Sequence, residues 1–151
     1  MQHEFRITHV SRELYDNFFD NHTLEQLNKV PPGFSNNLIW NIGHIIVSQQ
    51  MLVYLGSGLT PMVSEELTGK YMRGTRPEHD LSQKEADEIR SLLFTTVERT
   101  EQDYFNKVFK TFTERKTQLG FTLSTVEDAI SFNNYHEGIH LGMMMSIKKF
   151  L

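Results

Sequence analysis

The chain of 151 residues is long enough for one domain with its own core, and we expect residues 1–151 to form a single domain. The absence of Cys excludes disulfides, thiolate-ligated metal sites and a cysteine nucleophile, and the 7 His are the one abundant residue type capable of unusual chemistry. The formal charge of −4, with both signs interspersed, argues against binding to nucleic acid or anionic membranes. No apolar run approaches the roughly 18 residues of a membrane-spanning helix and the N-terminus lacks a signal-peptide core, so we expect a soluble, cytoplasmic protein.

Helical periodicity dominates the N-terminal part of the chain. Apolar residues at helical spacing predict one buried face of a first helix: Ile7, Val10, Leu14 and Phe18. A capping box at Thr23–Gln26 predicts the start of a short helix, which the turn at 31–33 ends. The segment from residue 35 or 36 to about residue 56 carries no formal charge, so we expect a largely buried helix there.

Residues 56–80 interrupt the helical pattern with Gly and Pro and contain one possible helical turn, at 64–67. A connection of about 25 residues is unusually long for a compact domain, and such loops often act as lids or binding loops. Capping boxes at Ser82–Glu85 and Ser124–Glu127 predict two more long helices, the first ending near Phe109 and the second continuing to the C-terminus. Four long helices with one long crossover loop predict an all-α four-helix bundle.

The segment His136-Glu137-Gly138-Ile139-His140 places two histidines one turn apart on the same helix face. Both imidazoles can therefore reach one metal ion, and the segment also fits the H-E-x-x-H pattern of zinc peptidases. The alternative is a pair of core histidines hydrogen-bonded to polar neighbours, which would require a partner for each ring in a Phe- and Met-rich helix. We favour His136 and His140 as metal ligands.

The third ligand has to come from upstream, because the residues after His140 include no Asp, Glu or His. The lack of a downstream ligand weakens the peptidase interpretation. His44 is the best candidate, since it lies near the middle of the uncharged helix and would face the middle of the last helix. Three imidazoles leave one or more positions open, which is typical of a catalytic metal site. A ferritin-like di-iron site is excluded because Glu137-x-x-His140 is the only E-x-x-H motif.

Several polar residues near these histidines have two possible roles. Glu137 lies about 100° around the helix from His136, so it is either a catalytic base beside the metal or a solvent-facing charge. Four residues either orient the ligands or simply cap and pack: Asn37, Asn41, Ser48 and Asn133. The other histidines are expected to be solvated surface residues: His3, His9, His22 and His79.

The segments Trp40-Asn41-Ile42-Gly43-His44-Ile45 and His136-Glu137-Gly138-Ile139-His140-Leu141-Gly142 together resemble the DinB/YfiT-like superfamily, whose closing motif commonly reads H-E-x-x-H-x-G. The resemblance covers most of the chain in helix order, loop placement and the three histidines. It implies a homodimeric four-helix bundle whose three histidines bind a divalent ion: nickel, zinc or iron, depending on the member. Met143 stands where relatives often have Gln, a departure that would alter the rim of the pocket.

The resemblance also implies a function, because characterised relatives include metal-dependent transferases that join a low-molecular-weight thiol to an electrophile, and a thiol-dependent isomerase. We expect an enzyme whose metal activates water or a small thiol against a small electrophilic substrate. In a chain without Cys, the thiol has to arrive as a substrate. The alternatives are a non-catalytic, metal-binding, dimeric stress or scaffold protein and, less favoured, an H-E-x-x-H metallopeptidase. Three histidines suit zinc, nickel, iron and copper, so the metal stays open.

Overall fold

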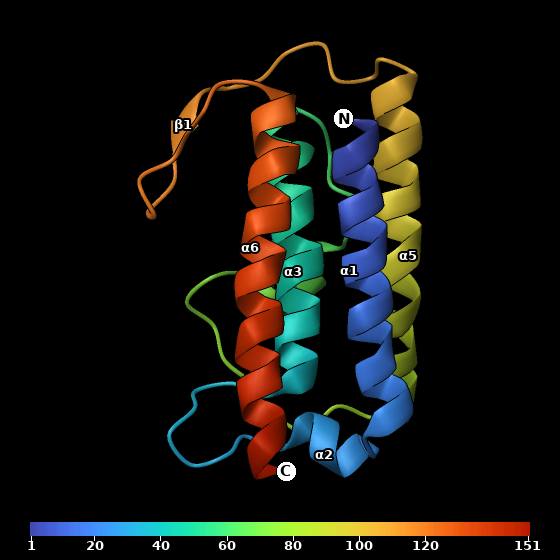
Figure 1. Ribbon diagram of the computed structural model, residues 1–151, viewed down its shortest axis with the longest axis vertical. Helices are drawn as coiled ribbons and strands as arrows, with labels where there is room; N and C mark the ends of the chain where they lie inside the picture. Colours follow the sequence, from blue (N-terminus) through green and yellow to red (C-terminus); the bar gives the residue numbers. More distant parts are fainter.

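The computed structural model describes all residues, 1–151, and is mostly helical (Figure 1). Four long helices form a bundle: α1 (Gln2–Asn21), α3 (Leu38–Val53), α5 (Gln83–Phe105) and α6 (Val126–Ile147). Two short helices lie in the connections, α2 (Leu24–Asn28) and α4 (Glu65–Tyr71), and 3₁₀ turns follow α3 and α6 at Leu55–Ser57 and Lys148–Phe150. The predicted all-α four-helix bundle is confirmed.

The long crossover follows from the directions of the helices. α1 and α6 begin at one end of the bundle, and α3 and α5 begin at the other end (Figure 1). Because α3 and α5 run parallel, residues 54–82 have to return along the whole length of the bundle. Within this crossover, α4 packs against α3 and is longer than the single turn that the sequence suggested. α6 packs between α3 and α1, which brings the last helix against the uncharged one.

Capping boxes begin the helices largely as predicted. In the boxes at Thr23 and Ser82, the hydroxyl accepts from the backbone N–H three residues on, and that residue's side chain accepts from the N-cap N–H. The third box is shifted by one residue from the prediction. Thr125 caps α6 and Asp128 takes the reciprocal position expected for Glu127. The expectation failed because two overlapping Ser/Thr–acid pairs compete at this helix start.

The connection between α5 and α6 contains a small hairpin that the sequence did not indicate. α5 ends at Phe105, before the expected end near Phe109, and Lys107 adopts a left-handed backbone conformation with φ of 58°. Strands β1 (Arg115–Lys116) and β2 (Thr122–Leu123) pair antiparallel. The ring of Phe112 lies 2.7 Å from where a Cβ of Gly56 would be, so glycine allows this connection to pack closely on the 3₁₀ turn that follows α3.

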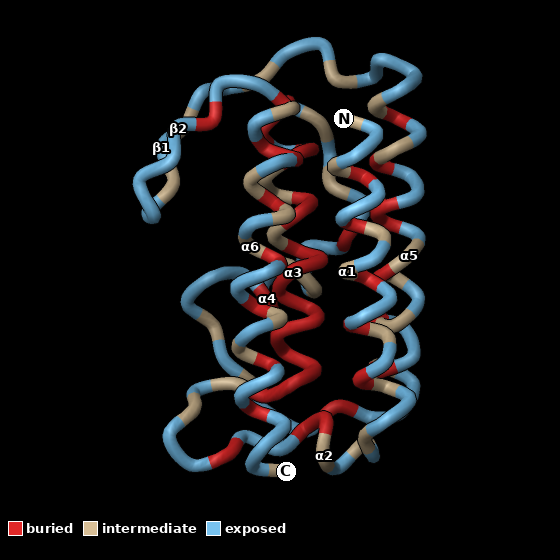
Figure 2. Tube along the Cα trace, viewed as in Figure 1, coloured by how far each residue is buried: buried red, intermediate tan, exposed pale blue.

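α3 is the central helix, and nearly all of its residues are buried (Figure 2). This confirms the prediction made from its lack of charge. The stretch Leu38–Ser57 has a mean hydropathy of 1.3 and is long and apolar enough to cross a membrane, contrary to the expectation that no segment would be. However, 78% of its apolar window is buried inside the bundle, as is typical of a core helix.

The buried face of α1 differs from the predicted one. Three of the four predicted core residues are exposed: Ile7 by 40%, Val10 by 51% and Leu14 by 45%. The core face instead carries a mixed set at helical spacing: Phe5, Thr8, Arg12, Tyr15 and Phe18. The prediction failed because apolar periodicity ignores polar residues, and Arg12 is buried only because Glu137 of α6 pairs with it.

Candidate metal centre

The three histidines predicted as metal ligands come together between α3 and α6. His44 projects from α3, and His136 and His140 lie on successive turns of α6. One ring nitrogen from each histidine lies within 4.8 Å of the others, and the ring centroids are 4.6–5.3 Å apart. His44 and His140 are buried, whereas His136 is half-buried. This group could hold a metal ion.

Hydrogen bonds orient two of the three rings. Nδ1 of His44 lies 2.7 Å from the carbonyl oxygen of Tyr71, and Nδ1 of His140 lies 2.8 Å from Oδ1 of Asn41. The Asn41 amide is itself oriented, because its Nδ2 donates to the carbonyl of Asn37 at 2.7 Å. Both partners are acceptors, so we assign the proton of each ring to Nδ1, which leaves Nε2 of each ring unprotonated. Histidines that bind metals are commonly oriented by such bonds.

The third ring carries a nitrogen without a partner. Nδ1 of His136 is buried and makes no hydrogen bond. Leaving a buried polar atom unpaired costs about 1–3 kcal/mol. A pair of core histidines satisfied by polar neighbours, which was the alternative interpretation, would not leave this nitrogen unpaired. The donor set of this site therefore fits a divalent ion.

Burial keeps all three imidazoles neutral. Burial first, and then the neighbouring histidines, lowers the pKa of His136 to about 4 and that of His140 to about 3. Burial also lowers the pKa of His44, against the opposing effect of its bond to the Tyr71 carbonyl. The neutral ring is the form that binds metal, so at neutral pH no proton has to leave these histidines first.

Close packing fixes the residues around His44. The indole of Trp40 stacks on its ring, with centroids 4.9 Å apart and planes 11° apart. The ring of Tyr71 occupies the space beside Gly43, and its Cδ1 would lie 2.5 Å from a Cβ at that position. The segment Trp40–His44 thus supplies a stacking ring, the Asn41 amide that orients His140, and room for Tyr71. Sequence reasoning missed Tyr71, because a backbone carbonyl acceptor leaves no trace in the residue type.

Of the four polar residues expected either to orient the ligands or to cap and pack, two contact the histidines and two do not. Asn41 contacts His140 and the Ser48 hydroxyl lies 3.2 Å from Nε2 of His44. Asn37 instead caps α3, where its Oδ1 accepts from the backbone N–H of Trp40 at 2.8 Å. Asn133 donates to Glu137 at 2.7 Å. Only Asn41 and Ser48 therefore contact the histidine cluster.

Glu137 lies in the core, toward α1. Its carboxylate accepts from Nε and Nη2 of Arg12 at 2.8–3.3 Å, and from Asn133. Both Arg12 and Glu137 are fully buried, so the expectation of a solvent-facing charge is wrong. A role for Glu137 as a catalytic base stays a prediction, although its oxygens are bonded to Arg12 and Asn133 and not to the histidines.

The remaining histidines stay outside the cluster. His3 and His79 are exposed and His22 is half-buried at the end of α1. His9 is half-buried and pairs with Glu101 across α1 and α5 at 2.8 Å. The only histidine-containing group close enough to hold a metal ion is His44, His136 and His140.

Comparisons with known proteins agree with this fold. The family model described as the DinB superfamily matches residues 7–144. A solved structure, the crystal structure of a conserved protein from Enterococcus faecalis, is similar over 99% of this chain and 95% of that one, with a TM-score of 0.68. The sequence identity is 12%, so this similarity shows the fold alone. No curated protein matches the chain.

Proposed function

Because the chain belongs to the DinB superfamily, we propose that it is a metal-dependent enzyme in which His44, His136 and His140 hold one divalent ion, either nickel, zinc or iron. The observation that carries the proposal is the cluster itself, with three ring nitrogens within 4.8 Å of one another. When bound, the ion supplies Lewis acidity that lowers the pKa of water or of a low-molecular-weight thiol. Three protein ligands leave room for that nucleophile.

In the proposed reaction this nucleophile loses its proton and attacks a small electrophilic substrate, and the bond between the attacked atom and its leaving group breaks. With a thiol the protein is a transferase, and with water it is a hydrolase. The chain's own residues hold and orient: Tyr71 and Asn41 fix the rings of His44 and His140, and burial limits the access of bulk water. The chain has no Cys, so the thiol is a second substrate. We place the protein in the cytoplasm, with small molecules and neither nucleic acid nor membrane as partners.

A panel of low-molecular-weight thiols and electrophiles tests the proposal. Adduct formation or hydrolysis should depend on added nickel, zinc or iron, and His136→Ala should abolish it. His9→Ala, which removes a histidine outside the cluster, is the matched control and should retain the rate. Activity that survives both chelation and His136→Ala would contradict the proposal.

Glu137 is tested separately by Glu137→Gln, which keeps the size of the side chain. A lower rate with unchanged metal content would support a role as a base. Unchanged rate and metal content would remove Glu137 from the mechanism. In the peptidase alternative Glu137 would be the base and would have to break its ion pair with Arg12. A casein digest tests this alternative directly, and a digest without products would dismiss it.

A second candidate function is a metal-binding stress or scaffold protein without catalysis. The observation that favours it is the burial of the cluster, since His44 and His140 are only 5% and 8% exposed. A protein that holds metal through all three histidines but is inactive with every nucleophile would support this alternative over the enzyme.

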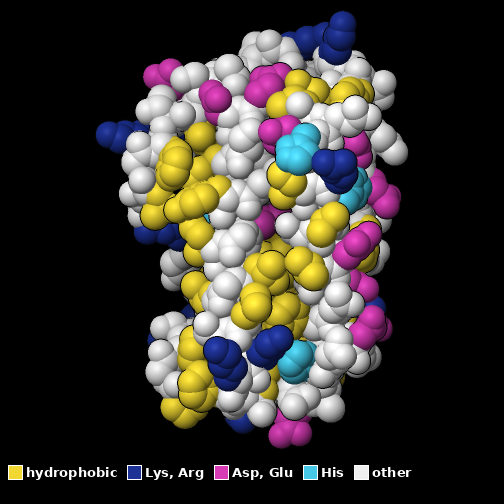
Figure 3. All heavy atoms as spheres, in the orientation of Figure 1, with side chains coloured by type: hydrophobic (Ala, Val, Ile, Leu, Met, Phe, Trp, Pro, Cys, Tyr) yellow, Lys and Arg dark blue, Asp and Glu magenta, His cyan; other side chains and the backbone are white.

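We also propose that the protein is a homodimer that pairs through α1 and α6. Apolar side chains gather on the face that these helices form (Figure 3). Exposed apolar residues of the two helices include Ile7, Val10, Leu14, Ile139 and Met145. Such contiguous apolar surface marks interaction sites in soluble proteins. In analytical ultracentrifugation, Leu14→Lys should halve the mass of the native protein, and a monomeric native protein would contradict the proposal.

A further inference from the structure

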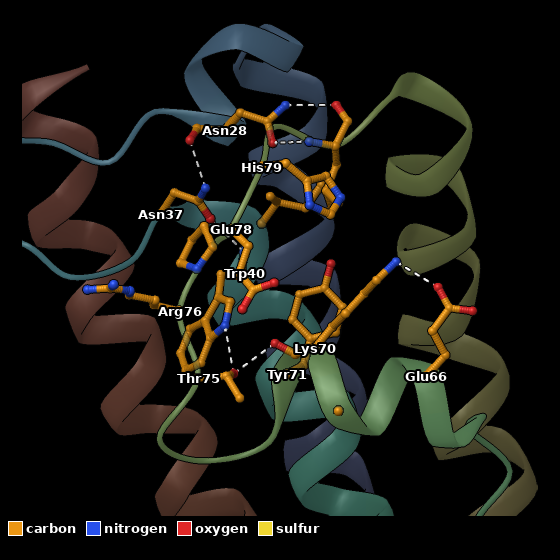
Figure 4. Close-up of a pocket in the computed structure, with 14 residues that line it drawn as sticks. Asn28, Asn37, Trp40, Glu66, Lys70, Tyr71, Thr75, Arg76, Glu78 and His79 are labelled. Carbon is orange, nitrogen blue, oxygen red and sulfur yellow. Dashed lines mark hydrogen bonds and ion pairs between the residues drawn. The ribbon is translucent and has the colours of Figure 1, made fainter.

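A cavity of about 210 Å³ lies between α3 and the crossover, and none of the three clustered histidines lines it. Its walls come from the first half of α3, from α4 and from residues 75–81 (Figure 4). Two residues that line the cavity also contact His44 of the histidine cluster. Trp40 stacks on His44, and the Tyr71 carbonyl accepts from that histidine. The cavity is therefore separate from the proposed metal site but adjacent to it.

The amide groups in the cavity wall are already bonded to the protein. Asn28 donates to the carbonyl of Leu81 at 2.9 Å and accepts from its N–H at 2.8 Å. Asn37 donates to the carbonyl of Asn28 at 2.7 Å (Figure 4). These bonds tie the end of the crossover to α2 and α3 and fix the shape of the cavity. They leave recognition of a ligand to other side chains.

Three polar side chains point into the cavity: the Tyr71 hydroxyl, the Glu78 carboxylate and the His79 imidazole (Figure 4). Tyr71 is only 4% exposed, and its position is fixed by Gly43 on the other side of the ring. The Tyr71 hydroxyl forms no hydrogen bond with a protein group, and Glu78, an exposed residue, forms no ion pair. Both groups can accept a hydrogen bond from a ligand.

The two cationic side chains that line the cavity, Lys70 and Arg76, point away from its interior (Figure 4). The Lys70 ammonium lies 2.9 Å from Glu66 and 3.7 Å from Glu85, so its charge is compensated. The Arg76 guanidinium points away from the other residues of the cavity (Figure 4). Among the groups that face inward, Glu78 thus carries the only formal charge, and its sign favours a positively charged ligand over an anion.

We propose that this cavity binds a small primary amine. The ammonium group donates to the Glu78 carboxylate and to the Tyr71 hydroxyl, and the apolar part of the ligand lies against the Trp40 indole. A charge-assisted bond to a carboxylate is stronger than a neutral one, and an aromatic wall adds to the attraction of a cation. This site goes beyond the proposed function, because it uses none of the metal ligands.

The protein contains its own reporter, since Trp40 is the only Trp and lines the cavity. Tryptophan fluorescence is followed while the full chain, as purified, is titrated with benzylamine, benzyl alcohol and benzoate, which differ mainly in charge. Benzylamine should give a saturable change, with benzyl alcohol at least about tenfold weaker and benzoate without effect. The titration is repeated after chelation, where the same preference is expected whether or not the protein binds metal.

Glu78→Gln should remove the preference for benzylamine over benzyl alcohol. Glu65→Gln is the matched control, because it makes the same charge change on α4 outside the cavity and should keep the preference. Equal affinities for the three probes, no saturable response to benzylamine, or a preference that survives Glu78→Gln would each overturn the proposal. None of these outcomes bears on metal binding, so the two proposals fail independently.

Discussion

Replacing Arg12 with methionine should destabilise the protein by about 3–5 kcal/mol, because the substitution leaves the Glu137 carboxylate buried without a cation. Both side chains have no exposed surface. The guanidinium donates to the carboxylate at 2.8–3.3 Å through Nε and Nη2, and Nη1 donates to the Leu93 carbonyl at 3.3 Å. Methionine fills part of the volume but replaces none of these bonds. The loss therefore comes mainly from the unpaired charge.

The double variant Arg12→Met/Glu137→Leu removes both charges and should recover at least about 2 kcal/mol of that loss, since a buried pair can be exchanged for apolar residues at little cost. Recovery is not complete, because the Leu93 carbonyl and the Asn133 amide lose a partner. The coupling between the two positions thus distinguishes an unpaired charge from simple loss of packing.

The assay is urea unfolding of chelator-treated protein, so that bound metal does not contribute to the measured free energy of unfolding. Arg90→Met is the matched control, because Arg90 is 36% exposed and pairs with Asp16 and Asp20 near the surface. It should cost about 1 kcal/mol or less. The reasoning is refuted if Arg12→Met costs no more than Arg90→Met, or if the double variant is as unstable as Arg12→Met.

Three further substitutions test the packing around the cluster and the surface of α6. Asn41→Ala should weaken metal binding about 10–100-fold, because His140 loses the acceptor for Nδ1; unchanged affinity in competition with a chelator would contradict this. Gly43→Ala should destabilise the protein by about 1–3 kcal/mol in urea unfolding, because the new methyl group meets the Tyr71 ring, whereas equal stability would mean that the ring moves freely. Gly142→Ala should stabilise the monomer by about 0.5–1 kcal/mol in thermal unfolding, measured in the Leu14→Lys variant. Nothing lies within 4 Å of the new Cβ, so destabilisation of the monomer would contradict the open space at this position.

Some elements could be predicted from the sequence because their signals are local. The absence of charge in α3 indicates burial by itself, and hydroxyl–acid pairs such as Ser82 and Glu85 mark a helix start within four residues. The cluster could be predicted because His136 and His140 share a face by spacing alone. His44 followed from the assumption that the middles of two bundle helices meet, which the packing of α3 on α6 confirms.

The features that escaped prediction depend on distant partners. Arg12 occupies the core only because Glu137 lies opposite, 125 positions away in the chain. The hairpin has strands of two residues each, too short to produce an alternating pattern. The orientation of His44 depends on the carbonyl of Tyr71, a group that every residue possesses. For Arg12 and His44, the determining interaction is a tertiary contact with no signature in the local sequence.

The metal content of untagged, purified protein tests the central claim most directly. Elemental analysis should find about one nickel, zinc or iron ion per chain, and His44→Ala and His140→Ala should each remove most of it, while His9→Ala retains it. A content below about 0.2 ion per chain that neither cluster substitution changes would contradict the account. The neutral histidine cluster would then hold no metal, and the unpaired Nδ1 of His136 would have no explanation.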